Sequence, residues 1–210
     1  MHEYPLISII ISSYRQMHFI FLAIDSVLKQ DYPNIELIVT DDGTDDFNIT
    51  DVKHYIECNN RGNISRIKVL KNSVNVGTVK NLNGALAVVE GKYVMFLDGD
   101  DLHAAQCISK AADFMESNRH YFVAAGHVIL FNDGEDILTL KIIKDATLHD
   151  KLGMESHDRY VYMCKKVCLP TLVRIFSNEN SSTQNDFLTS VTDCTKTGLC
   201  FFALHDKATA

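Results

Sequence analysis

Basic side chains and long apolar runs are both scarce in this chain of 210 residues. Its 20 Lys and Arg residues are outnumbered by 27 Asp and Glu residues, which gives a formal net charge of −7 at pH 7. This balance argues against a nucleic-acid partner, because a phosphate backbone is bound by clustered Lys and Arg side chains. No run of roughly eighteen apolar residues is present, so we expect no membrane-spanning segment. The first residues lack the basic start of a signal peptide. We therefore expect a cytoplasmic protein, or one attached peripherally to the inner face of a membrane.

The six cysteines lack the spacing of a zinc site. Cys164 and Cys168 are separated by three residues, and Cys194 and Cys200 by five. No pair of histidines completes a ligand set, so buried, reduced thiols are the better interpretation. The nine histidines are scattered, and the pattern assigns a catalytic role to none of them.

An apolar segment that runs directly into carboxylates is the most informative feature of the chain. Residues 93–97 are followed by Asp98, Asp100 and Asp101. A short apolar run is typical of a buried strand in a parallel sheet, where ligands bind outside the carboxyl ends of the strands. Carboxylates this close repel one another unless a cation lies between them, and hard oxygen ligands suit Mg²⁺ or Mn²⁺. A solvated acidic turn is the alternative that this segment leaves open.

Strands and helices alternate through the first 117 residues. The apolar patterns predict strands at 6–11, 35–40, 67–70 and 93–97, and helices at 17–29, 51–58, 78–89 and 104–116. This order, with short connections, predicts an α/β fold in which helices flank a mostly parallel sheet. Gly91 fits a left-handed cap after the third helix, and Asp101 fits an N-cap of the fourth. The second strand also ends in two acids, Asp41 and Asp42.

The second half of the chain is less regular. The patterns predict a hairpin from 122–131 and 137–143, partial helix over 161–176, a helix over 185–198 and a last strand at 199–204. Nothing in the composition separates a second domain, so we treat residues 1–210 as one domain.

Five segments, taken together and in this order, resemble family 2 glycosyltransferases. They are Ser8–Tyr14, Ser26–Ile38, Asp41–Thr44, Asn75–Gly77 with Lys80 and Asn81, and Gly91–Tyr93 leading into Asp98–Asp101. The resemblance is strong over residues 5–117 and weak over the remainder. It implies the GT-A fold, a Rossmann-like α/β arrangement with a nucleotide-sugar-binding half (1–117) and a smaller, irregular acceptor-side half (118–210). Family members usually continue past the last strand, so we expect acceptor-covering segments beyond residue 210.

The resemblance implies an inverting transfer of a sugar from a nucleotide-diphosphate donor to a glycan or lipid-linked acceptor. A UDP-sugar is the expected donor, and a hexosyl- or N-acetylhexosaminyltransferase of bacterial surface-polysaccharide synthesis is the expected enzyme class. Asp100 resembles the ligand of the Mn²⁺ or Mg²⁺ ion that stabilises the departing diphosphate. Asp98 resembles the family residue on the ribose side of the donor.

The same resemblance assigns residues to the base and the diphosphate. Asp42 lies where the family places a carboxylate that accepts a hydrogen bond from the base, with turn capping by Asp41 and Asp42 as the alternative role. Tyr14 is expected to pack against the base and Ser12 to bond to it. Lys80 resembles a basic position near the diphosphate, although an isolated lysine on a helix is often only solvated. The chain departs from the family at Arg15, where Asn is usual.

An inverting transferase also needs a general base that removes the proton of the acceptor hydroxyl. In the family this base is a carboxylate in an acidic pair that opens a late helix, and Asp186 lies at that place. Its neighbour Asn185 is not an acid, so capping of the helix is the alternative role. Asp193 is the weaker substitute.

Two other functions stay open at this level. The first is another Mg²⁺-dependent nucleotidyl or phosphoryl enzyme, but residues 12–15 supply neither a Gly-rich basic loop nor an Asp-x-Asp nucleophile motif after the first strand. The second is a glycosyltransferase-like module that binds a nucleotide without turnover. The missing acid at position 185 keeps this second alternative open.

Overall fold

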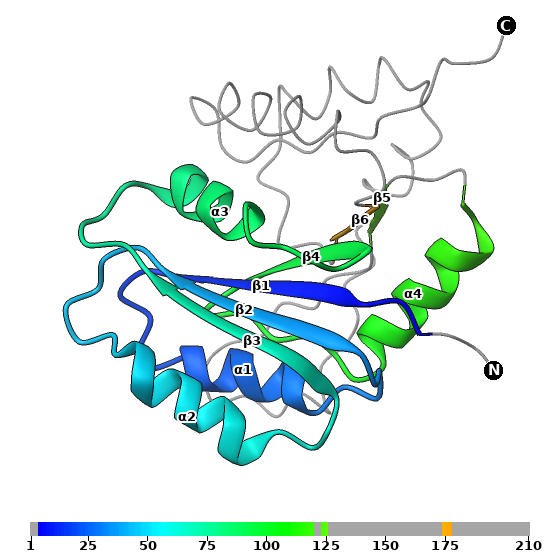
Figure 1. Cartoon of the computed structure of the whole chain (residues 1–210), viewed down its shortest axis with the longest axis horizontal. Helices are drawn as coiled ribbons and strands as arrows, with labels where there is room; N and C mark the ends of the chain where they lie inside the picture. Colours follow the sequence, from blue (N-terminus) through cyan, green and yellow to red (C-terminus); the bar gives the residue numbers. More distant parts are fainter. Residues whose placement is uncertain (1–3, 120–122, 126–173, 178–210) are drawn as a thin grey trace, which may run out of the picture.

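A computed structural model of the chain describes residues 4–119, 123–125 and 174–177. Its centre is one sheet with the strand order β3-β2-β1-β4-β6-β5 (Figure 1). The strands are β1 (Ile7–Ser13), β2 (Ile35–Asp41), β3 (Ile64–Lys71), β4 (Tyr93–Asp98), β5 (Val123–Ala125) and β6 (Arg174–Ser177). β1 to β4 are parallel, whereas β6 is antiparallel to both β4 and β5. The predicted α/β fold with a mostly parallel sheet is thereby confirmed.

Within the described residues, four helices cover the two faces of this sheet (Figure 1). They are α1 (Ile20–Leu28), α2 (Ile49–Asn59), α3 (Thr78–Leu86) and α4 (Cys107–Ser117). The buried side chains of α1, α2 and α4 share one apolar cluster with one face of β1, β2 and β4. The other face packs against α3 in a smaller cluster of Ile10, Ile38, Ala85, Leu86 and Val94. No helix among the described residues is both long and apolar enough to cross a membrane.

The central strands form because their residues suit a sheet that is covered on both sides. Every residue of β1 and β2 is buried, and most of them are isoleucine, leucine or valine. Alternate side chains of a strand point to opposite faces, so a continuous apolar run fills both clusters. β3 lies at the edge of the sheet and carries Arg66, Lys68 and Lys71. Charged side chains are typical of an edge strand, and here they hid the first residues of β3 from the predicted range 67–70.

Two predicted caps are wrong. The helix α3 ends at Leu86, and the only described glycines with positive φ are Gly43, Gly62 and Gly77. Gly91 is required for another reason, because a Cβ atom at this position would lie 2.5 Å from the Ser8 hydroxyl oxygen. The helix α4 begins at Cys107 with Gln106 as its N-cap residue, so Asp101 caps no helix.

Other outcomes are mixed in the less regular part of the chain. The predicted strand from residue 122 is present as the short strand β5, whereas the helix predicted over 161–176 is wrong at its end, where residues 174–177 form β6. The elements predicted at 137–143, 185–198 and 199–204 lie outside the described residues. The described residues include two cysteines, Cys58 and Cys107, and both are free thiols. Cys58 is exposed, contrary to the prediction of buried thiols, and Cys107 is partly buried.

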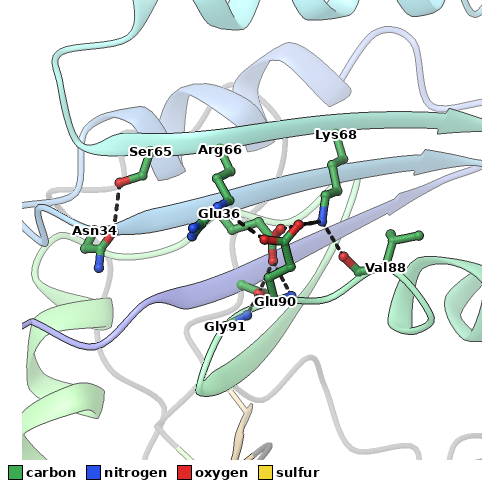
Figure 2. A network of polar contacts seen from close by, with 9 residues as sticks. Asn34, Glu36, Ser65, Arg66, Lys68, Val88, Glu90 and Gly91 are labelled. Carbon is green, nitrogen blue, oxygen red and sulfur yellow. Dashed lines mark hydrogen bonds and ion pairs between the residues drawn. The ribbon is translucent and has the colours of Figure 1, made fainter.

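A buried carboxylate anchors the connection between α3 and β4 to the sheet (Figure 2). Glu36, near the start of β2, is fully buried. Its side chain accepts hydrogen bonds from the Ser8 hydroxyl and from the backbone N–H of Glu90. Lys68 of β3 lies 2.7 Å from Glu36 and 2.5 Å from Glu90, and it also donates to the carbonyl of Val88. A buried charge is costly unless it is paired and hydrogen-bonded, and Glu36 is both.

We expect Glu36→Ala to lower the free energy of unfolding by about 3 kcal/mol, because it removes a fully buried carboxylate together with its ion pair to the partly exposed Lys68 and two further hydrogen bonds. Denaturant unfolding measures this loss. The matched control is Glu57→Ala, which removes an exposed i,i+4 pair with Lys53 at 3.9 Å and should cost less than about 0.5 kcal/mol. Equal losses in the two variants would contradict the anchoring role of Glu36.

Candidate functional site

The register of the parallel strands brings polar residues of β1, β2 and β4 together at the carboxyl edge of the sheet. Ser12 lies opposite Thr40 on β2 and opposite Asp98 on β4. The Ser12 hydroxyl donates to Asp98 Oδ1 at 3.1 Å. All three side chains point to the α3 face, because Ile10, Ile38 and Val94, two or four residues earlier in their strands, pack against α3. Two of the predicted site residues, Ser12 and Asp98, are thus in direct contact.

The acidic turn after β4 follows from Gly99. Its N–H donates to the carbonyl of Ser12 at 2.8 Å and continues the pairing of β4 with β1. A Cβ atom here would lie 2.8 Å from Gln16 Oε1 and 3.1 Å from the Ser12 carbonyl oxygen, so a larger residue would have to displace the Gln16 side chain and press on the backbone of β1. The N–H of Asp101 then donates to the carbonyl of Asp98 at 3.0 Å, and Asp100 is exposed at the tip of the turn.

The carboxylates of this turn suit a hard divalent cation that a ligand helps to hold. Within the described residues, no three His, Cys, Asp or Glu side chains are arranged to bind a metal ion by themselves. Mg²⁺ is usually bound by one or two carboxylates together with substrate phosphates and water. Asp98 and Asp100, both exposed at the strand end, supply such carboxylates. The two carboxylates therefore fit a divalent ion that also binds the phosphate groups of a substrate.

Asp42 organises the loop between β3 and α3. Its side chain is 3% exposed. Oδ1 accepts hydrogen bonds from Asn72 Nδ2 at 3.0 Å and from the N–H of Val76 at 2.8 Å. Oδ2 accepts from the N–H of Gly77 at 2.8 Å. The carboxylate therefore binds the start of α3, where backbone N–H groups lack partners within the helix.

Asn81 extends this cluster from α3 back to β2. Its Oδ1 accepts from the Thr40 hydroxyl at 2.7 Å and from Asn72 Nδ2 at 3.0 Å, and its Nδ2 donates to the Thr40 carbonyl at 3.3 Å. Asn72 thus bridges Asn81 and Asp42. Asn81 belongs to one of the five segments named above but carried no predicted role, and Asn72 belongs to none of them. The sequence offered one signal for this cluster: Asn72 directly follows a strand, and Asn81 is a polar residue inside an amphipathic helix.

Asp41 points to the other face of the sheet from Ser12, Thr40 and Asp98. Its Oδ2 accepts from the N–H of Thr44 at 2.7 Å, which is the turn-capping role left open above. Its Oδ1 and the hydroxyl of Ser13, which lies opposite it on β1, are buried and have no hydrogen-bond partner among the described residues.

Tyr14 lies at the same edge, in the loop after β1, with 36% of its surface exposed. The guanidinium carbon of Arg15 lies 5.0 Å from the centroid of the Tyr14 ring. Arg15 has φ of 57°, a left-handed conformation in which Asn is favoured over Arg. Its N–H donates to the Thr44 hydroxyl at 2.8 Å, which holds the loop against the turn after β2. The Tyr14 ring is therefore partly exposed at this edge, with the Arg15 guanidinium over it.

Two predicted site residues are not joined to this cluster. Lys80 is exposed on the first turn of α3, and within the described residues its side chain makes no hydrogen bond or ion pair. Asp186 lies outside the described residues, so its role stays a prediction.

A histidine is buried behind the acidic turn. His103 is 6% exposed, and its N–H donates to the Ser26 hydroxyl at 3.0 Å. Its ring Nδ1 lies 3.8 Å from the Cys107 sulfur, and Nε2 has no partner among the described groups. Burial lowers the pKa of His103 to about 4. The imidazole is therefore neutral and packs the turn against α1 rather than carrying charge into the site.

Comparison with known proteins assigns the family. The model of a family described as glycosyl transferase family 2 matches residues 8–162. The chain belongs to this family. The UDP-Glc:alpha-D-GlcNAc-diphosphoundecaprenol beta-1,3-glucosyltransferase WfaP of Escherichia coli is 36% identical over 124 residues, which are 59% of this chain and 47% of that protein. An uncharacterized glycosyltransferase of Haemophilus influenzae is 32% identical over 159 residues, which are 76% of this chain and 60% of that protein. The chain spans about half the length of the curated relatives that it matches.

Solved structures agree with this assignment at the level of the fold. The crystal structure of S. aureus TarS 1-349 matches with a TM-score of 0.54 at 24% identity, covering 81% of this chain and 46% of that chain. The mannosyltransferase PcManGT from Pyrobaculum calidifontis, in complex with GDP-Man and Mn²⁺, matches with a TM-score of 0.61 at 16% identity, covering 98% of this chain and 56% of that chain. The predicted GT-A fold of this family 2 chain is therefore confirmed.

His103 makes the stability of the protein depend on pH in a predictable direction. Its pKa in the folded state, about 4, lies below the ordinary value of 6.5. Between pH 4 and pH 6.5 the unfolded chain therefore binds a proton at this histidine that the folded chain does not bind. Stability is therefore lost as the pH falls through this window, by about 2 kcal/mol between pH 7 and pH 5. Urea unfolding at both pH values should show this loss reduced in His103→Gln. The exposed His54, changed in the same way, provides the control; a His103→Gln variant with the full wild-type loss would contradict the assignment.

Proposed function

We propose that this chain transfers a sugar from a UDP-sugar to a glycan or lipid-linked acceptor, with inversion at the anomeric carbon and with the help of Mn²⁺ or Mg²⁺. The observation that carries the proposal is the meeting of Ser12, Asp42 and Asp98 at the carboxyl ends of β1, β2 and β4 in a family 2 chain. In parallel α/β sheets this edge is where ligands bind. Relatives support the donor and acceptor classes, because WfaP is named for UDP-Glc and for a diphosphoundecaprenol acceptor.

The base and ribose of the donor belong at β1 and β2 in this proposal. The exposed ring of Tyr14 packs against the base, and Asp42 accepts a hydrogen bond from a base N–H. Asp98 faces the ribose. Ser12 orients the Asp98 carboxylate through the hydrogen bond between them, and it also bonds to the nucleoside. TarS, which shares the fold, has been determined with UDP and with UDP-GlcNAc.

The diphosphate belongs at the acidic turn after β4. Asp100, exposed at its tip, is the proposed ligand of the divalent ion. The ion supplies Lewis-acid stabilisation of the negative charge that develops on the departing nucleoside diphosphate. Lys80, exposed and without a partner among the described residues, contributes a second positive charge from the start of α3.

The acceptor belongs to residues 118–210, and Asp186 is the proposed general base. Inversion requires the attacking hydroxyl and the leaving diphosphate on opposite sides of the anomeric carbon, so the base must come from another segment than the metal ligand. A lipid-linked acceptor would bring the protein to the cytoplasmic face of a membrane, in keeping with surface-polysaccharide synthesis.

A nucleotide-binding module without turnover is the main alternative, because Asn185 replaces the acid expected beside Asp186. Hydrolysis of a UDP-sugar in the presence of Mn²⁺ separates the two functions. We expect slow, metal-dependent release of UDP; binding without any release would favour the inactive module. Family membership argues against a phosphatase or a nucleotidyltransferase.

The metal assignment predicts that UDP binds tightly only with a divalent cation. Calorimetric titration should show at least about a tenfold loss of UDP affinity when EDTA replaces Mn²⁺, since a carboxylate edge repels a diphosphate without an ion. Asp100→Ala should bind UDP equally weakly in both conditions. The matched control is Asp113→Ala, an exposed acid on α4, which should keep the metal dependence. Wild-type affinity that EDTA leaves unchanged would rule out this metal site.

The assignment of the base predicts that Asp186→Asn keeps UDP binding but lowers transfer to the acceptor by roughly 10²–10⁴-fold. The amide can still cap a helix, so the free energy of unfolding should hardly change. Asp193→Asn is the comparison variant and should transfer at close to the wild-type rate. The roles would have to be exchanged if Asp193→Asn lost activity and Asp186→Asn did not.

A further inference from the structure

The hydrogen bonds of Asp42 limit what its carboxylate can still accept from a ligand. An ionised carboxylate has about four acceptor positions, two on each oxygen. Asn72 Nδ2 and the N–H of Val76 fill both positions of Oδ1, and the N–H of Gly77 fills one of Oδ2. One acceptor position, on Oδ2, remains.

This count distinguishes between nucleotide bases. Uracil offers one N–H donor, at N3, between two carbonyl oxygens. Guanine offers two neighbouring donors, the N1–H and the N2 amino group, which a carboxylate with two free oxygens can accept side by side. An Asp42 with one open position satisfies uracil and leaves a donor of guanine without a partner, which is costly in a site closed to water.

We propose that Asn72, oriented by Asn81, is a specificity-determining residue that keeps Oδ1 of Asp42 occupied and thereby selects uridine over guanosine nucleotides. The proposal rests on the proposed function, because it requires that Asp42 accepts a hydrogen bond from the donor base. Asn72 and Asn81 act through Asp42 and need not touch the ligand themselves.

The cluster is arranged so that Asn72 cannot easily release Asp42. Its Nδ2 is shared between Asp42 Oδ1 and Asn81 Oδ1, both at 3.0 Å. Asn81 is 3% exposed and is itself fixed by two hydrogen bonds to Thr40, one to the hydroxyl and one to the carbonyl. The side-chain amide of Asn72 is therefore held on Asp42 by the packing of α3 against β2.

A second close contact fixes the loop that carries Val76 and Gly77. Gly43 follows Asp42 with φ of +83°, and a Cβ atom there would lie 2.6 Å from the carbonyl carbon of Val74. The backbone N–H groups of Val76 and Gly77 therefore stay on Asp42 when Asn72 is changed, which leaves two of its three hydrogen bonds in place. For this reason an Asn72 variant should fold and should change only the occupancy of Oδ1.

The test measures the ratio of UDP to GDP affinity for the full chain by calorimetry with Mn²⁺. The wild type should bind UDP at least about tenfold more tightly than GDP. Asn72→Leu has a similar shape but no donor, so it frees one position of Oδ1 and should reduce this ratio by about tenfold. Asn81→Leu should change the ratio in the same direction, because Asn72 loses the group that orients it.

The matched control is Asn63→Leu. Asn63, just before β3, is buried like Asn81, and its Nδ2 donates to the carbonyls of Val27 and Gln30. Asn63→Leu should lose thermal stability but keep the wild-type ratio of UDP to GDP affinity. If Asn72 had a merely structural role, Asn72→Leu would also keep the wild-type ratio.

The outcomes separate the two proposals. If the wild type binds UDP and Asn72→Leu has the same UDP-to-GDP affinity ratio as the wild type, the selectivity role is overturned. The proposed function then still stands. A wild type that binds GDP as tightly as UDP overturns it as well. A wild type that binds neither nucleotide contradicts the proposed function itself.

Discussion

β1 pairs in parallel with β2 on one side and with β4 on the other, so that Ser12 lies opposite both Thr40 and Asp98. The site residues on β1, β2 and β4 take their positions from this pairing, because parallel strands end at the same edge of a sheet. A shift of one residue would turn these side chains to the opposite face of the sheet. It would also move Ile9 and Ile11 out of the cluster with α1 and Ile10 out of the cluster with α3. The fully buried Ile7, Ile9, Ile10 and Ile11 therefore fix the register, and with it the site.

The helix α3 is held against this sheet by polar contacts at both ends and by an apolar contact between them. Near the amino ends of the strands, Glu36 binds Ser8, Lys68 and the backbone of Glu90, just after α3 (Figure 2). At the carboxyl ends, the cluster of Thr40, Asn81, Asn72 and Asp42 holds the first turns of the helix. Buried polar groups are satisfied in only one arrangement, so both clusters specify where α3 lies. Lys80 and the loop before it are thereby brought to the site edge.

The sequence was sufficient to predict β1, β2 and β4 and the acidic edge, because apolar runs that end in polar or acidic residues combine two strong signals. The amide cluster was not predictable, since Asn72 and Asn81 have no pattern of their own and meet only after α3 packs on β2. The extent of β3 was hidden by Arg66 and Lys71, whose charges reflect its edge position, whereas Lys68, inside the predicted range, pairs with the carboxylate of Glu36.

Other errors came from reading local signals without their tertiary partners. Gly91 suggested a helix cap, but its close approach to Ser8 depends on a residue 83 positions away. Asp101 suggested a helix start, whereas the chain first buries His103 against Ser26 of α1 and only then begins α4. The role of Asp186 stays a prediction, because it rests on resemblance and lies outside the described residues.

The central claim is that the carboxyl edge of β1, β2 and β4 holds the nucleotide of the donor. A crystal structure of the full chain soaked with UDP and Mn²⁺ tests it most directly. The account predicts uracil against the ring of Tyr14 with its N3 bonded to Asp42, and Mn²⁺ between Asp100 and the diphosphate. A nucleotide bound away from this edge, or a base that leaves Asp42 untouched, would contradict it.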